Sequence, residues 1–208
     1  MKVRYSPRVL DRDVAPGISS FSKADIPDLR AQFPSHKYWM TLHLLGNVLK
    51  PVKTPYRQYA TSLVYRTRMC FAYYHSAKEY TLKYLENLDP ASPPLGTYYK
   101  AISLWENAFL NWSISVDIFC KLSKEKVFEE KDGSSAQRAY DITNQIKHWG
   151  ERIRDGKAEE AAIPVWLTNK GFSSVNLKLA YHEFAGLVED VARLPNEILI
   201  AKGLVKSK

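Results

Sequence analysis

The stretch from residue 56 to residue 88 contains neither proline nor glycine, and it limits the possible folds more than any other feature of the sequence. Apolar and aromatic residues recur along it at helical spacing, namely Tyr59, Leu63, Met69 or Cys70, Tyr73, Ala77 and Tyr84. This periodicity predicts one long amphipathic helix. Because such a helix must bury its apolar face against other elements, we expect a protein built from long packed helices.

The next segment predicts a second helix, which is more apolar than the first. Pro90, Pro93 and Pro94 form a stiff connection, after which Thr97 is a candidate cap for a helix that runs to about Lys124. Its large apolar residues are three or four positions apart, a spacing suited to the seam of a helical bundle: Trp105, Phe109, Trp112, Val116 and Phe119.

A third helix is predicted over about residues 136–155. The Gly-Ser-Ser sequence at residues 133–135 supplies turn and cap residues before it, and Gly156 stands where a helix would end. Its expected core stripe consists of Ile142, Ile146, Trp149 and Ile153.

A fourth helix is predicted over about residues 176–200, with Pro195 as a kink or interruption. Its apolar positions are Leu179, Phe184, Leu187, Val191 and Leu194. Before it, residues 163–172 indicate a short extended piece with a tight turn at residues 169–171. This piece is too small to change the fold class.

The amino-terminal segment predicts a proline-rich arm and a short helix. Four prolines interrupt any long helix before residue 35, namely Pro7, Pro16, Pro27 and Pro34. Ser35 is a candidate cap for a helix over residues 36–50, in which Trp39, Leu42, Leu45 and Leu49 recur at helical spacing.

These elements together predict an all-α fold. We expect a four-helix up-down bundle over residues 56–200, preceded by an arm and a short extra helix over residues 1–55 and followed by a basic tail over residues 201–208. The 208 residues are enough for one domain with a sizeable core. The composition, 45% hydrophobic and 25% charged, argues against a disordered or fibrous protein.

The charge balance favours acidic or phosphate-bearing partners. Thirty Lys and Arg residues against 22 Asp and Glu residues give a net charge of +8. The cations are spread along the chain, so a merely solvated surface explains them about as well.

The sequence argues against disulfide, metal and cofactor sites and against a membrane or secreted location. Cys70 and Cys120 are the only cysteines, so we expect no disulfide framework, metal site or cofactor. No apolar run approaches 18 residues, and the amino terminus lacks the layout of a signal peptide. We therefore expect a cytoplasmic protein that does not contact membranes.

Among the five histidines, His148 has the most suggestive neighbours. The sequence contains no glycine-rich phosphate loop, zinc-binding helix or serine-nucleophile elbow. On the third predicted helix, however, Asp141, Asn144, His148 and Arg152 are spaced three, four and four residues apart and would share one face. That face would meet water or another subunit, and a solvated polar face is the simpler explanation.

The segment Asn144-Gln145-Ile146-Lys147-His148, preceded by the tryptophan-rich helix over residues 104–119, resembles the HEPN superfamily. The turn at residues 164–172 also looks like one found in some bacterial members, and the similarity covers roughly residues 56–200. The resemblance implies a four-helix, typically dimeric protein. Many members act in phage defence, toxin–antitoxin pairs or RNA processing, as metal-independent ribonucleases whose motif is an arginine, four to six residues, then a histidine.

The chain departs from that motif at the arginine. Thr143 occupies its place and provides no cation for a phosphate. Arg138 would lie about 15 Å from His148 along a helix, which is too far to replace the arginine on the same chain. Arg152 would lie roughly 6 Å beyond His148 and could reach the same site from either subunit. In such a site His148 would act as base or acid, Arg152 or Lys147 as the cation, and Asn144 would orient the phosphate. Ribonuclease activity is therefore expected to be weak or absent.

Polar residues on the second predicted helix offer a further part of such a site. Asn107, Asn111 and Ser115 are four residues apart and would either complete a polar pocket beside His148 or hydrogen-bond within the bundle. Our candidate catalytic residues are His148, Asn144 and Arg152, and our candidate binding residues are Lys147, Asp141, Asn107 and Asn111.

Three hypotheses about function remain open. The first is an RNA-directed homodimer, either a nuclease or a binder. The second is a non-catalytic HEPN-like scaffold that holds a protein partner. The third is a bundle that binds a small ligand between its helices.

Overall fold

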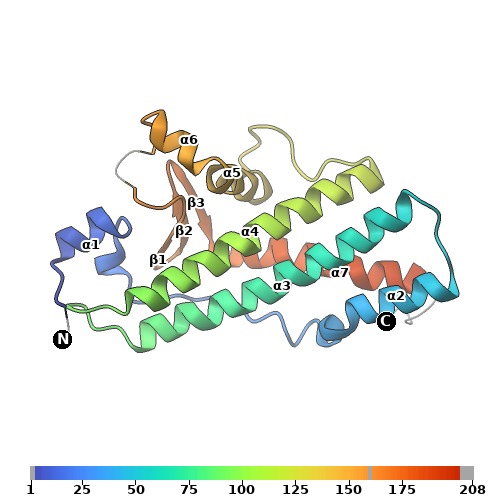
Figure 1. Ribbon diagram of the computed structural model, residues 1–208, viewed down its shortest axis with the longest axis horizontal. Helices are drawn as coiled ribbons and strands as arrows, with labels where there is room; N and C mark the ends of the chain where they lie inside the picture. Colours follow the sequence, from blue (N-terminus) through green and yellow to red (C-terminus); the bar gives the residue numbers. More distant parts are fainter. Residues whose placement is uncertain (1–2, 159–160, 202–208) are drawn as a thin grey trace.

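The computed structural model describes residues 3–158 and 161–201 (Figure 1). The prediction of a mostly helical protein is confirmed, and a small antiparallel sheet is the departure from a purely helical class. In the described ranges the elements are α1 (Pro7–Asp13), η1 (Ile18–Ser20), η2 (Pro34–Tyr38), α2 (Trp39–Leu49), α3 (Tyr56–Glu86), α4 (Leu95–Ser123), α5 (Ser135–Lys147), α6 (Trp149–Arg154), β1 (Trp166–Thr168), β2 (Gly171–Ser174), β3 (Leu177–Ala180) and α7 (Tyr181–Ala201).

The two longest helices, α3 and α4, lie side by side and make the most extensive contact in the molecule (Figure 1). Helix α7 packs against both of them, α5 packs on α4, and α2 packs on α3 and α7. The predicted long helix agrees closely with α3, whereas α4 begins two residues before Thr97. The predicted seam of α4 is buried at four positions, Trp105, Phe109, Trp112 and Val116, and Phe119 is partly buried.

Aromatic rings from three elements meet in the centre of the core. Phe109 of α4 stacks on Phe184 of α7 with ring centroids 4.0 Å apart. Phe172 of β2 meets Trp105 edge-on at 4.7 Å, and the Trp105 indole donates a hydrogen bond to Thr81 Oγ1 at 3.0 Å. The sheet is therefore bound to the helices through the core and not only through its loops.

The predicted third helix is broken at His148. Helix α5 ends at Lys147, His148 has non-helical φ and ψ of −111° and 22°, and α6 is a separate short helix. The expected core stripe fails at its end, because Ile153 is 55% exposed. The low helix propensity of Gly150 within this segment is consistent with the interruption.

The predicted fourth helix starts too early, since residues 177–180 form β3. Asn176 takes a left-handed φ of 62° between β2 and β3. A side chain at Gly171 would overlap the Leu179 carbonyl, so the close pairing of these two strands depends on glycine. The expected turn at residues 169–171 does join β1 to β2.

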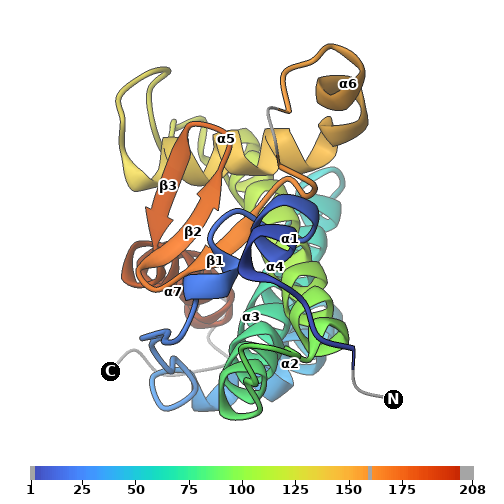
Figure 2. The same ribbon diagram turned by 90° about the vertical axis from the view of Figure 1, so that its left-hand side faces the viewer.

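The amino-terminal segment belongs to the same core as the helices. Its apolar side chains are almost fully buried at Leu10, Ala15, Ile18, Phe21, Leu29 and Phe33. The Phe21 ring stacks on Tyr84 of α3 at 5.9 Å, and the Tyr74 hydroxyl donates to Pro27 O at 2.9 Å. Figure 2 shows α1 and η1 lying beside β1.

The predictions for the short extra helix are only partly correct. Trp39 is buried and Leu42 is half-buried, but Leu45 and Leu49 point to solvent. Ser35 caps no helix; its hydroxyl bonds to Asn196 Oδ1 of α7 at 3.2 Å. From residue 202 onward, the predicted basic tail lies outside the described residues.

Cysteine, metal and membrane features give little indication of function. Cys70 and Cys120 are unpaired, and burial raises the pKa of the Cys70 thiol. Among the described residues, no group of histidine, cysteine and acidic side chains is arranged to hold a metal ion. Nor is any helix of this part of the chain both long and apolar enough to cross a bilayer.

Candidate functional site

His148 lies at the junction of α5 and α6, with 59% of its side chain exposed. Its Nδ1 is 3.1 Å from Glu151 Oε2, which is the contact of an ion pair when the imidazole is protonated. The histidine is thus accessible to a large ligand such as RNA. An RNA phosphate would have to compete with the Glu151 carboxylate for the protonated imidazole.

Thr143, the residue in place of the motif arginine, is buried, whereas His148 is exposed. Its side chain is fully buried between α5 and α4, where Oγ1 donates to Ala139 O at 2.9 Å and lies 3.4 Å from Phe109 O. A guanidinium at this position would enter an apolar interface. The two motif positions therefore do not share one surface in this chain.

Asp141, Asn144 and Lys147 lie on the less buried part of α5. Asp141 and Asn144 are half-buried, and burial together with nearby Glu130 raises the pKa of Asp141. The Lys147 ammonium lies 3.3 Å from Ser113 Oγ of α4 and 5.8 Å from the centre of the Tyr140 ring. Lys147 and His148 are adjacent exposed cationic or titratable groups at the end of α5.

Arg152 lies one turn beyond His148, and its backbone N–H donates to His148 O at 3.1 Å, but the break at His148 separates it from Asp141 and Asn144 on α5. Its Nη2 donates to Lys157 O at 3.1 Å, in the loop after α6. The guanidinium therefore stabilises that loop, and an RNA would have to displace this contact to use it.

Asn107 and Asn111 are not brought to His148. The Asn107 amide donates to Ser103 O at 2.7 Å within its own helix, and Asn111 Oδ1 accepts from Arg66 of α3 at 3.2 Å. Asn111 Nδ2 and the Ser115 hydroxyl also bond to carbonyls one turn back. This row therefore hydrogen-bonds within α4 and to α3, which is the alternative considered from the sequence.

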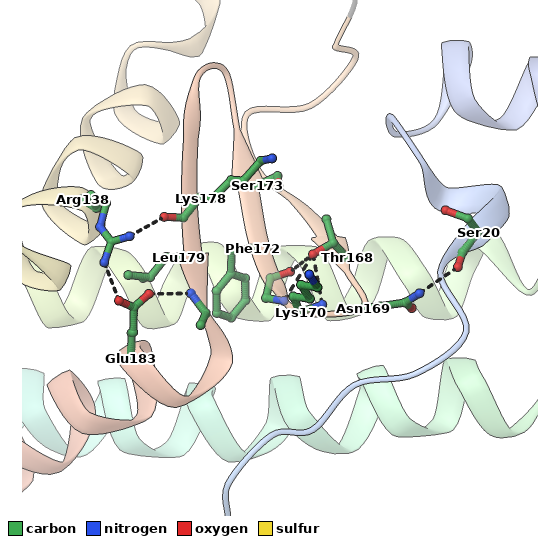
Figure 3. A pocket seen from close by; sticks show the side chains of 12 residues that line it. Ser20, Arg138, Thr168, Asn169, Lys170, Phe172, Ser173, Lys178, Leu179 and Glu183 are labelled. Atoms are coloured by element: carbon green, nitrogen blue, oxygen red, sulfur yellow. Dashed lines mark hydrogen bonds and ion pairs between the residues drawn. The ribbon is translucent and has the colours of Figure 1, made fainter. Parts of the chain in front are cut away.

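A pocket of about 520 Å³ lies beside the sheet, and it was not foreseen from the sequence (Figure 3). On one side Arg138 of α5 donates to Lys178 O at 3.3 Å and pairs with Glu183 of α7. On the other side Asn169 donates to Ser20 O at 3.2 Å. Because these partners are between 40 and 149 residues apart along the chain, no local pattern predicts the pocket.

Most polar groups of this pocket already bind one another. Asn169 Oδ1 accepts the backbone N–H groups of Ser22 and Lys23, and Thr168 Oγ1 accepts from Gly171 N. The hydrogen bonds around the pocket therefore mainly join the sheet to α5, α7 and the amino-terminal segment.

Comparison with known proteins identifies no relative, since no family model, curated protein or solved structure matches the chain.

Proposed function

We propose that this chain is a HEPN-like, RNA-associated protein whose metal-independent ribonuclease activity is weak or lost. The proposal rests on one observation: His148 and Lys147 are exposed together at the end of α5, while Thr143 is buried on another side of the helix. In this proposal α3, α4, α5 and α7 are the four helices of the HEPN-like bundle, and the protein works as a cytoplasmic homodimer.

The proposed contact is electrostatic. Lys147 supplies a permanent positive charge, and His148 adds a second when it is protonated, so the end of α5 attracts an RNA phosphate. Cleavage would also need a cation to stabilise the transition state, and loss of such a donor commonly costs about 100-fold to 1000-fold in rate. With Arg152 bound to Lys157 O, binding is favoured over cleavage.

Salt-dependent binding of a labelled single-stranded RNA tests the contact. We expect Lys147→Ala to weaken binding and to reduce the slope of log affinity against log salt by about 0.7, the value for one phosphate contact. Lys83→Ala is the matched control, because Lys83 is also exposed in the last turn of a helix and also lies 5.8 Å from a tyrosine ring. Equal effects of the two variants would contradict a contact at α5.

Cleavage is tested by incubating end-labelled RNA with the protein in EDTA. We expect little or no cleavage, and any residual activity should disappear in His148→Ala. Thr143→Arg restores the family's arginine in sequence but places a charge in the α4–α5 interface, so we expect lower stability, by about 3 kcal/mol or more, and no gain in cleavage. A stable, active Thr143→Arg protein would overturn this account.

The second candidate function, a module that holds a protein partner, is favoured by a different surface. Helix α2 presents leucine and valine side chains to solvent, at the end of the long axis away from α6 (Figure 1).

A further inference from the structure

Helix α2 buries a histidine beside Trp39 and exposes four large apolar side chains to solvent. Trp39, His43 and Gly46 form its buried side, and His43 Nε2 lies 3.0 Å from Thr61 Oγ1 of α3. Its outer side chains are exposed by 52% at Leu44, 49% at Leu45, 76% at Val48 and 61% at Leu49. A helix packed only against its own protein has the reverse arrangement.

The exposed apolar side chains are concentrated around this helix. Most of the large ones in the described part of the chain fall between residues 38 and 65, and we call these the α2 patch: Tyr38, Leu44, Leu45, Val48, Leu49, Val52, Tyr56 and Tyr65. Scattered exposed leucines are normal, but a contiguous group is typical of a site that binds another molecule.

The patch borders a groove between α2 and α3. The groove has a volume of about 790 Å³; Met40, Leu44 and Val48 line it from α2, and Thr61 and Tyr65 line it from α3. The lining residues on α2 run from Met40 to Val48, which corresponds to about 12 Å at the rise of an α-helix. The groove therefore matches roughly two turns of a second helix lying along α2.

The charges of the segment that carries the patch are mostly of one sign. No aspartate or glutamate occurs from residue 29 to residue 78. From residue 37 to residue 68 the exposed cations are Lys37, Lys50, Lys53, Arg57 and Arg68. Within residues 29–78, the exposed apolar side chains are thus accompanied by basic side chains and by no acidic one.

The shape and charge of the groove favour one kind of binding partner over the others. A second copy of the chain would set one group of basic side chains against another, which is unfavourable. A flat lipid surface would leave the floor of the groove unfilled. A helix with apolar side chains along one face and carboxylates beside them matches both the shape and the charge.

We propose that the groove between α2 and α3 binds an amphipathic helix of a partner protein, with its apolar side chains on Leu44 and Val48 and its Asp or Glu side chains beside Arg57 and its basic neighbours. This inference deepens the second candidate function, and it does not depend on RNA contact at α5. The partner is specified here by chemistry: leucine-like anchors flanked by acidic residues.

The test uses the full chain and two labelled synthetic helical peptides as probes. Both peptides carry the same leucine stripe, one with glutamate and the other with lysine on its flanks, and fluorescence anisotropy measures their binding. We expect the glutamate peptide to bind at least tenfold more tightly than the lysine peptide. We expect Leu44→Asp to lose that binding by at least tenfold.

Ile153→Asp is the matched control, because Ile153 is 55% exposed on the distant helix α6. It should bind the glutamate peptide as the wild type does, and circular dichroism should show that both variants remain folded. Equal binding of the two peptides, or unchanged binding by Leu44→Asp, overturns the proposal.

Two further measurements separate the other occupants. Sedimentation with vesicles containing anionic lipid, lost in Leu44→Asp without any preference between peptides, would assign the patch to a lipid surface and overturn the proposal. A dimer that dissociates in Leu44→Asp, with no peptide binding, would assign it to a second copy. RNA binding by Leu44→Asp should remain unchanged, so failure of this inference is distinguishable from failure of the RNA contact.

Discussion

At the scale of single residues, burial decides which ionisable groups respond to pH. The His75 side chain is only 7% exposed, and its Nδ1 lies 3.8 Å from Asp28 Oδ1. Burial lowers its pKa from 6.5 to about 4, and the lowering is only partly offset by the attraction of Asp28. His148, by contrast, is largely exposed, so the two histidines have opposite environments on the same protein.

The low pKa of His75 predicts a pH-dependent stability. The unfolded chain binds a proton at this residue below about pH 6.5, whereas the folded protein does so only near pH 4, so stability falls as the pH drops through this window. We expect the free energy of unfolding to fall by about 2 kcal/mol more between pH 7 and pH 5 in the wild type than in His75→Gln, from urea titrations at both pH values. Identical pH dependences would show that His75 is not the responsible group.

At the scale of elements, the long helices follow from local pattern and the sheet does not. The limits of α3 agree with its proline-free and glycine-free stretch because helical hydrogen bonds are local. Residues 177–180 fit the spacing of the following helix through Leu179, but they pair with β2 instead. The break at His148 was likewise hidden, because the helical spacing of Asn144, His148 and Arg152 continues across it.

The start of α7 depends on one carboxylate with two partners. Glu183 accepts the Ala180 backbone N–H at 2.8 Å, as a residue in the first turn of a helix often does, and it also pairs with Arg138 of α5. Both charged side chains are about one third exposed, so solvent screens the pair.

We therefore expect Glu183→Gln to lower the free energy of unfolding by about 1 kcal/mol, measured from the urea midpoint. Glu189→Gln is the control on the same helix, since Glu189 accepts from Arg193 one turn away and, within residues 3–158 and 161–201, is linked to no second element. It should change stability by less than about 0.5 kcal/mol. A larger loss in the control would show that the link to α5 contributes little.

At the scale of the whole molecule, the amino-terminal segment is part of the structural core. A proline-rich composition predicted an arm, and its lack of long helices is correct, but composition alone did not reveal how deeply its apolar side chains are buried. The candidate site shows the same limit. The sequence located His148 and its polar neighbours, while the burial of Thr143 and the orientation of Asn111 toward α3 depend on how helices pack.

Truncation of one core side chain in this segment tests its contribution. Phe21 is 1% exposed and stacks on Tyr84, so we expect Phe21→Ala to cost about 3–5 kcal/mol in unfolding free energy. Val9→Ala, at a position 37% exposed on α1, should cost far less. Similar losses for both variants in urea titrations would mean that the segment packs less tightly than its burial indicates.

The hydrogen bonds between Asn169 and the amino-terminal segment also have a consequence for synthesis on the ribosome. Asn169 Oδ1 accepts from Ser22 N and Lys23 N, and these partners are separated by 147 and 146 residues. The amino-terminal segment thus lacks this hydrogen-bond partner until the β1–β2 hairpin has been translated. The segment can pack on α3 as soon as that helix has been made, but its docking is completed only when the hairpin around Asn169 forms.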